Sequence, residues 1–192
     1  MADLTVHLDP VCPWAWRTFL WLREVRAVRP MEIAWKILSL KEINREDDPD
    51  VRGEAFVEPA ERLLVLARRE GGSDAFEKLF LALGRARHER RENLTGEEVL
   101  AAALAEAGLD SSLLPRALDD SSVFEEASAE HRGAVTAYDA FGVPWLVVDG
   151  RRYGFFGPVI SEVPAGDAAV ELWEHVSWMI SQPYFYELKR PR

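Results

Sequence analysis

The segment that decides the fold of this 192-residue chain reads Asp9-Pro10-Val11-Cys12-Pro13-Trp14-Ala15-Trp16, and it holds the only cysteine. It follows an apolar stretch, residues 4–8, that is predicted to be a strand. Pro13 suits the first position of a helix, because the N–H that proline lacks has no partner there in any case. Apolar residues continue this helix to about Val28, and Pro30 ends it. Cys12 is therefore predicted to lie at a helix N-terminus, directly after a strand.

A second strand follows this helix. Met31, Ile33, Trp35 and Ile37 alternate with small or polar residues, which is the period of a half-buried strand. A central parallel strand would be apolar throughout, so this strand is predicted to lie at an edge of the sheet. Residues 1–45 thus form a βαβ unit.

The middle of the chain, residues 46–133, is predicted to be an all-helical insert. A polar connector at about residues 44–54 precedes a helical pattern that Gly71-Gly72 stops. Apolar residues spaced for one helix face come next, and residues 95–98 and 122–125 fit capping boxes. The first of these boxes opens a helix that is expected to end at Gly108.

Strand signals return in the last part of the chain, residues 134–192. We expect a strand at 144–148, a tight hairpin at Asp149-Gly150 and a return through residues 151–153. A rigid aromatic turn at Phe155-Phe156-Gly157-Pro158 and an amphipathic helix around residues 169–180 close the chain. The order βαβ, helical insert, ββα predicts an α/β protein with one domain and an insertion.

Composition excludes several classes of function. The net charge of −10 argues against non-specific nucleic-acid binding, which needs clustered cations. No apolar run approaches the length of a membrane-spanning helix, and residues 1–8 lack the basic and apolar regions of a signal peptide. With one cysteine no internal disulfide can form. We expect a cytoplasmic protein that binds neither nucleic acid nor a membrane, and the sequence leaves a homodimer open.

Two features point to chemistry at Cys12. A free thiol is only about 3% ionised at neutral pH, and a helix N-terminus stabilises the thiolate and lowers the thiol pKa. The alternative is a buried, inert cysteine. Gly142-Val143-Pro144 precedes a strand, where a proline is disfavoured. A cis Val143-Pro144 bond would resolve this conflict and present the Val143 backbone to a ligand, and a trans proline at the strand start is the alternative.

Together these segments resemble the DsbA-type proteins of the thioredoxin fold, and most closely the actinobacterial mycothiol-dependent nitroreductases. The resemblance rests on residues 9–16, the helical insert, Gly142-Val143-Pro144, Phe155-Phe156-Gly157-Pro158 and residues 185–190, and it covers nearly the whole chain. It implies a thioredoxin-like α/β fold with an inserted helical subdomain. It further implies that Cys12 is the redox nucleophile, that the Val143-Pro144 loop faces it, and that the insert covers the site.

The chain departs from the dithiol members of this family at Ala15, where they carry a resolving cysteine. A monothiol route remains, in which mycothiol or a similar small thiol is the cosubstrate and no cofactor is tightly bound. The expected substrates are disulfides or small electrophiles such as nitroaromatics. Two alternatives stay open: a transferase or isomerase like the kappa-class glutathione transferases, and a non-catalytic binding module.

Other residues offer weaker candidates. The active-site motif includes Pro13 and Trp14, and the aromatic residues Trp14, Trp16, Phe155 and Phe156 could line a flat apolar substrate pocket or belong to the core. His7 is expected to pack in neutral form rather than to tune the thiol, and Asp9 to be a turn residue rather than a proton relay. The basic stretch 85–91 is expected to be a solvated helix face. The histidines at positions 7, 88, 131 and 175 lack metal-ligand spacing, so no metal site is predicted.

Overall fold

The structure is a computed structural model that describes residues 3–46 and 57–190. Its sheet contains β1 (Leu4–Leu8), β2 (Ile33–Ile37), β3 (Trp145–Val148) and β4 (Phe155–Phe156), in the order β2-β1-β3-β4. β2 pairs parallel to β1, whereas β3 is antiparallel to both β1 and β4. The prediction that β2 lies at an edge is confirmed, and its pattern of alternating burial fits that position.

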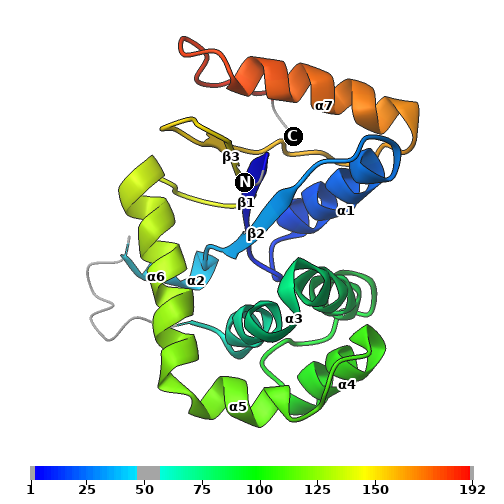
Figure 1. Cartoon of the computed structure of the whole chain (residues 1–192), viewed down its shortest axis with the longest axis vertical. Coiled ribbons are helices and arrows are strands. Elements are labelled where there is room, and N and C mark those ends of the chain that lie inside the picture. Colours follow the sequence, from blue (N-terminus) through cyan, green and yellow to red (C-terminus); the bar gives the residue numbers. More distant parts are fainter. Residues whose placement is uncertain (1–2, 47–56, 191–192) are drawn as a thin grey trace.

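Contacts between two helices join the N-terminal and C-terminal parts of the chain. α1 (Pro13–Val28) packs against α7 (Asp167–Ile180), the closing helix that the sequence predicts. The Trp21 indole donates a hydrogen bond to the Ala169 carbonyl at 3.0 Å, and its ring lies 6.1 Å from that of Trp173. Figure 1 shows α7 at the opposite end of the molecule from α3, α4 and α5.

The predicted helical middle of the chain is confirmed as helical where it is described. It contains α2 (Leu40–Glu46), α3 (Pro59–Gly84), the π-helical segment η1 (Arg85–Glu89), α4 (Glu97–Ala107), α5 (Leu113–Asp119) and α6 (Ser121–Tyr138). Residues 44–46 of the expected connector lie in α2, and residues 47–54 fall outside the described residues. α6 runs past residue 133, so the boundary expected there falls inside a helix.

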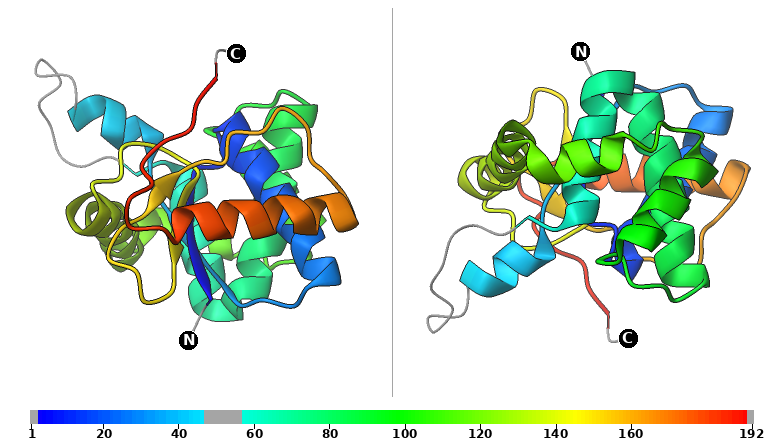
Figure 2. Two further views of the ribbon diagram at one scale, coloured as in Figure 1. Left: turned by 90° about the horizontal axis from the view of Figure 1, so that it is seen from above. Right: turned by 90° about the horizontal axis from the view of Figure 1, so that it is seen from below.

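The helical layer is tied to the sheet by packing and charge. Phe19 of α1 meets Trp35 of β2 and Phe80 of α3, with ring centroids 5.2 and 4.7 Å apart. Arg68 of α3 donates to the Trp35 carbonyl and pairs with Glu130 of α6. In Figure 2 the orange-red α7 lies in front when the molecule is seen from above, and the green helices α4 and α5 lie in front when it is seen from below. No helix in the described part of the chain has the length and apolar character needed to cross a membrane.

Local signals in the sequence located some helix ends correctly and misplaced others. Gly72 adopts φ 69° and interrupts α3 at the predicted stop, and the left-handed Gly108 ends α4. Both predicted capping boxes are wrong. Gly96 caps α4 because Thr95 lies in a turn that Asn93 closes, and Asp120 caps α6 by accepting the Ser122 N–H at 2.8 Å.

The tight turn predicted at Asp149-Gly150 forms, since the Val148 carbonyl accepts the Arg151 N–H at 3.1 Å, but the return strand expected directly after it does not. Gly150 has the positive φ expected of the turn, at 72°, but the chain pairs with β3 again only at β4. Residues 151–153 therefore belong to a loop, and Phe155–Phe156 form a strand instead of a turn. The loop runs close to Trp145, since a Cβ at Gly154 would lie 2.0 Å from its indole nitrogen, so a side chain larger than that of glycine does not fit there.

Candidate active site around Cys12

Cys12 occupies the N-cap position of α1, as the sequence predicts. Its backbone is extended, with φ −82° and ψ 119°, and Pro13 opens the helix. The Cys12 carbonyl accepts the Trp16 N–H at 3.0 Å, and the Cys12 N–H donates to the Asp9 carbonyl at 3.1 Å. The residue is 4% exposed, and its sulfur takes part in no disulfide. The positive end of α1 therefore lies beside the sulfur and favours negative charge there.

The loop before β3 faces the sulfur directly. The Cys12 thiol donates to the Val143 carbonyl, with 3.6 Å between Sγ and oxygen, across 131 positions of sequence. The Val143-Pro144 peptide bond is cis, and the Pro144 carbonyl accepts the Gly157 N–H at 2.8 Å. The loop is thus fixed to the residue that follows β4, so its backbone presents a defined surface to Cys12.

A second cis bond, at Gly157-Pro158, connects this loop region to α1. Thr18 Oγ1 donates to the Pro158 carbonyl at 2.9 Å, and Thr18 is fully buried. Ala15, one turn after Cys12, is also fully buried. Because the 192 residues contain a single cysteine, none of their other side chains can resolve a disulfide formed at Cys12.

The helical layer contributes a contact that sequence reasoning missed. His88 of η1 donates from Nε2 to the Pro10 carbonyl at 2.9 Å, and its ring stacks on Trp16 at 5.9 Å. Burial lowers the pKa of His88, so the neutral ring is favoured. The stretch 85–91 was expected to be a solvated face, but its Ala86 is buried and its His88 half-buried. The sequence signal for this contact is the pair of uncharged positions, Ala86 and His88, within an otherwise charged segment.

Asp9 holds the turn that precedes Cys12, as expected. One carboxylate oxygen accepts the Val11 N–H and the other the Leu40 N–H, both at 2.8 Å. Glu61 of α3 lies beside it, and its Oε2 accepts the Glu58 N–H at 2.8 Å. Burial raises the pKa of Asp9, and burial together with the Asp9 charge raises the pKa of Glu61 well above its usual range. Glu61 carries no local sequence signal for this contact, because it meets Asp9 only through tertiary packing.

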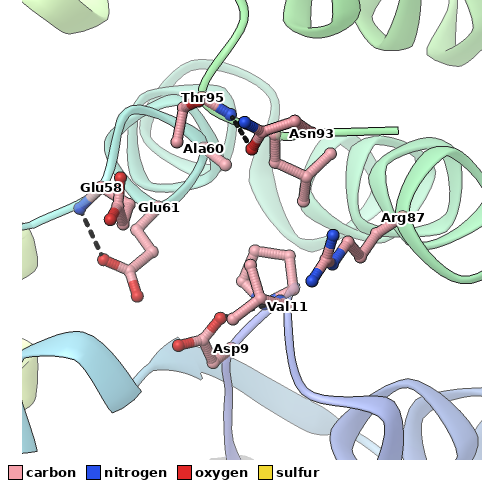
Figure 3. Close-up of a pocket in the computed structure, with 10 residues that line it drawn as sticks. Asp9, Val11, Glu58, Ala60, Glu61, Arg87, Asn93 and Thr95 are labelled. Carbon is pink, nitrogen blue, oxygen red and sulfur yellow. Dashed lines mark hydrogen bonds between the residues drawn. The ribbon is translucent and has the colours of Figure 1, made fainter. Parts of the chain in front are cut away.

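These acids border a cavity of about 100 Å³ next to the residues that lead into Cys12. Its lining includes Pro10 and Val11 from the active-site loop, Glu58 and Ala60 from the start of α3, and Arg87, Asn93, Leu94 and Thr95 from the helical layer. In Figure 3 Asp9 and Glu61 face each other on one side, while Arg87 points in from η1. The cavity is lined by both charges and is largely polar at its buried end.

The aromatic residues predicted for a substrate pocket do not line this cavity. Trp16 is buried and stacks on Phe19 and His88, while half-buried Trp14 lies under the Arg17 guanidinium at 5.0 Å. Half-buried Phe155 stacks on Phe185, and exposed Phe156 lies against Phe141, also exposed. They belong to separate contacts, so a shared role in substrate binding stays a prediction.

The surroundings of the other histidines indicate structural roles rather than catalytic ones. His7 of β1 is 3% exposed and lies opposite Trp145 of β3. Burial, with a smaller effect of Lys36, lowers the pKa of His7 to about 4, so the ring is neutral. His131 is buried in α6, whereas His175 is exposed on α7. Within residues 3–46 and 57–190, no three His, Cys, Asp or Glu side chains gather as they would around a metal ion.

Known proteins share this arrangement. A probable DsbA oxidoreductase from Streptomyces coelicolor is similar over 100% of this chain and 94% of that chain, with a TM-score of 0.64 and 17% identity. A 2-hydroxychromene-2-carboxylate isomerase is similar over 92% of this chain and 93% of that chain, with a TM-score of 0.66 and 14% identity. These likenesses concern the fold alone, and they confirm the predicted thioredoxin-like α/β fold.

Similarity in sequence, unlike similarity in fold, identifies the family of this chain. The uncharacterized protein Rv2286c of Mycobacterium tuberculosis is 34% identical over 195 residues, which cover 100% of this chain and 83% of that protein. The family model described as "Rv2466c-like: Mycothiol-dependent nitroreductase Rv2466c" matches residues 11–190, from the active-site loop to the C-terminal segment. The chain therefore belongs to the Rv2466c-like family of thioredoxin-fold oxidoreductases, which takes its name from a mycothiol-dependent nitroreductase.

Proposed function

We propose that this protein is a cytoplasmic monothiol oxidoreductase in which Cys12 reacts and mycothiol, or a similar small thiol, completes each cycle. The observation that carries the proposal is the position of the Cys12 sulfur, at the N-terminus of α1 and 3.6 Å from the Val143 carbonyl. A helix N-terminus stabilises a thiolate, and the fixed loop at Val143-Pro144 gives a sulfur substrate a surface against which to align. Membership of a family named for mycothiol dependence supports the choice of thiol.

The first step is thiol–disulfide exchange. The Cys12 thiolate attacks one sulfur of a disulfide R–S–S–R′, so that a Cys12–S–S–R bond forms and R′S⁻ leaves with the electron pair of the broken bond. In the second step a mycothiol thiolate attacks the R sulfur and releases the Cys12 thiolate. Ala15 offers no sulfur for an internal attack, so the second thiol must come from solution.

Reduction of a nitro group is balanced in the same way. The Cys12 thiol and one mycothiol thiol together give up two electrons and two protons, which convert a nitro group to a nitroso group and water. The product on the protein is the Cys12–mycothiol mixed disulfide. A second mycothiol then exchanges with it, so two mycothiol molecules become one mycothiol disulfide for each nitro group reduced.

Turnover with mycothiol as the sole reductant tests the proposal. Loss of thiol is followed without oxygen, with a nitroaromatic or a mixed disulfide as acceptor. Cys12→Ser is expected to lower kcat by at least about 100-fold, because serine is a far weaker nucleophile in this exchange. Gly133→Ala, on the exposed side of α6, is the matched control and should leave turnover unchanged. Full turnover by Cys12→Ser would rule out the redox role and favour a transferase in which the cosubstrate thiol is the nucleophile.

A further inference from the structure

His88 contacts the chain on both sides of Cys12. Its Nε2 lies 2.9 Å from the Pro10 carbonyl oxygen, two residues before the cysteine. Its ring stacks on that of Trp16, four residues after the cysteine, with the centroids 5.9 Å apart and the planes 19° from parallel. The Trp16 N–H in turn donates to the Cys12 carbonyl at 3.0 Å. One side chain of the helical layer therefore holds both the first turn of α1 and the loop that leads into it.

The peptide between Pro10 and Val11 is held at both of its polar groups. Residues 9–12 form a β-turn, in which the Asp9 carbonyl accepts the Cys12 N–H at 3.1 Å. The central peptide of such a turn is the one whose orientation differs between turn types. Here its N–H donates to the Asp9 carboxylate at 2.8 Å, and its carbonyl accepts from His88. Asp9 belongs to the turn itself, so His88 is the anchor that comes from a distant part of the chain.

The backbone that carries His88 has an unusual form. η1 is π-helical, and the Arg90 N–H donates to the Arg85 carbonyl, five residues before it, at 3.0 Å. Single π-helical turns are rare and are found mostly at functional sites. The chain also comes close to α1 here, since a Cβ at Gly84 would lie 2.2 Å from the Trp16 ring. The π-helical turn and this close approach together bring the His88 ring to the active-site loop.

The protonation state of His88 suits a fixed hydrogen-bond donor. A carbonyl oxygen can only accept, so the Nε2 atom that meets the Pro10 carbonyl carries a proton. Burial lowers the pKa of His88, the bond to Pro10 opposes this shift, and the charges of Arg87 and of Arg17 in α1 add to it. The ring is therefore neutral in the pH range where a thiol ionises. Its influence on the sulfur is then one of geometry rather than of charge.

We propose that His88 is a positioning residue for the reaction of Cys12. It holds the Pro10–Val11 peptide from the helical layer, and so keeps the Cys12 sulfur at the N-terminus of α1 and beside the Val143 carbonyl. This inference rests on the proposed function, because it assigns a role in the reaction of that thiol. Without the His88 donor the central peptide of the turn can rotate, and the sulfur moves away from the helix N-terminus that stabilises its thiolate.

Alkylation of Cys12 by iodoacetamide tests this role in the full chain without any mycothiol. The rate follows the fraction of thiolate, so its dependence on pH gives both the thiol pKa and the rate constant of the thiolate. His88→Phe retains a ring that can stack on Trp16 but lacks the donor, whereas His88→Gln lacks the ring but places an amide N–H near the position of Nε2.

The two variants should differ in the alkylation profile. We expect His88→Phe to raise the thiol pKa by at least about 0.5 and to lower the rate at neutral pH by about 3- to 10-fold, the effect of one hydrogen bond. His88→Gln should recover at least about half of the wild-type rate, because it restores that bond. His175→Phe, on the exposed side of α7, is the matched control and should leave the profile unchanged.

Urea unfolding shows whether each variant is folded. If His88→Phe does not fold, His88→Asn takes its place, since its amide is one methylene shorter than that of glutamine and falls short of the Pro10 carbonyl. A profile that the variant without the donor leaves unaltered, or that His88→Gln alters to the same extent, would overturn the positioning role.

The same variants distinguish this inference from the proposed function. If mycothiol supports turnover but alkylation is insensitive to the His88 donor, the positioning role is refuted and the proposed function stands. If alkylation depends on that donor in a protein that mycothiol does not turn over, the proposed function is refuted and the positioning role stands.

Discussion

The contact between Gly84 and Trp16 gives the sharpest prediction about the architecture of the site. Gly84 ends α3, and a Cβ there would lie 2.2 Å from two carbons of the Trp16 ring. Ordinary carbon–carbon contacts are about 3.5–4.0 Å, so Gly84→Ala forces the ring or the helix to move by more than about 1 Å. Trp16 is 6% exposed and stacked between Phe19 and His88, so it has no free space to move into.

The size of the effect follows from two opposing terms. Alanine in place of glycine stabilises a helix interior by about 1 kcal/mol, while overpacking a closed core costs about 1–3 kcal/mol. The overlap at Gly84 is severe, so the upper part of that range applies and the net loss is about 2 kcal/mol. With a urea m-value of about 2 kcal/mol/M, the unfolding midpoint should fall by about 1 M.

Gly133→Ala is the control, since Gly133 lies within α6 and a Cβ there meets nothing within 4 Å. Its free energy of unfolding should rise by roughly 0.5 kcal/mol or more, and its urea midpoint should rise with it. Urea unfolding followed by tryptophan fluorescence measures both variants. Gly84→Ala should also slow the reaction of Cys12, because displaced Trp16 and His88 shift the Pro10 carbonyl. Equal stability gains in the two variants would refute the close packing of α3 against α1.

Three further predictions concern other parts of the site. His7 has a pKa of about 4 in the folded protein, whereas an unfolded histidine takes up a proton near pH 6.5, so the free energy of unfolding falls as the pH drops from 6.5 to 4. His7→Gln should remove up to about 1.4 kcal/mol per pH unit of this loss, and equal pH slopes for the two proteins in urea unfolding would contradict the assignment. Thr18→Val leaves the Pro158 carbonyl without its donor and should lower the free energy of unfolding by about 1–2 kcal/mol; a midpoint like that of wild type would show that this bond is unimportant. Ala15→Cys should shorten the lifetime of a mixed disulfide at Cys12, followed by mass spectrometry of the decaying adduct, and an unchanged lifetime would argue against an internal attack from position 15.

The fold was predictable because its main elements have strong and redundant signals. The strand at 4–8, the helix after Pro13 and the alternating strand at 33–37 each combine periodicity with a clear start or stop, and all three are confirmed. The errors occur where one residue type fits two roles. Thr95 and Ser122 both satisfy a capping pattern, yet Gly96 and Asp120 cap the helices, because the position of the first helical turn decides which residue can act.

The candidate site was predictable only along the active-site loop itself. The position of Cys12 at a helix N-terminus follows from Pro13 and the preceding strand, and it is confirmed. Glu61 and His88 could not be found in this way, since they reach Asp9 and Pro10 through the packing of helices that are distant in sequence. Their burial and their protonation states depend on tertiary contacts, which no local sequence pattern records.

In the cycle that we propose, Cys12 takes up one small thiol and depends on another to release it. Intact-protein mass spectrometry after exposure to mycothiol disulfide tests it most directly. We predict a mass increase of one mycothiol on the wild-type protein, reversed by added mycothiol and absent in Cys12→Ser. A wild-type protein that stays unmodified, or an adduct that persists in Cys12→Ser, would contradict it.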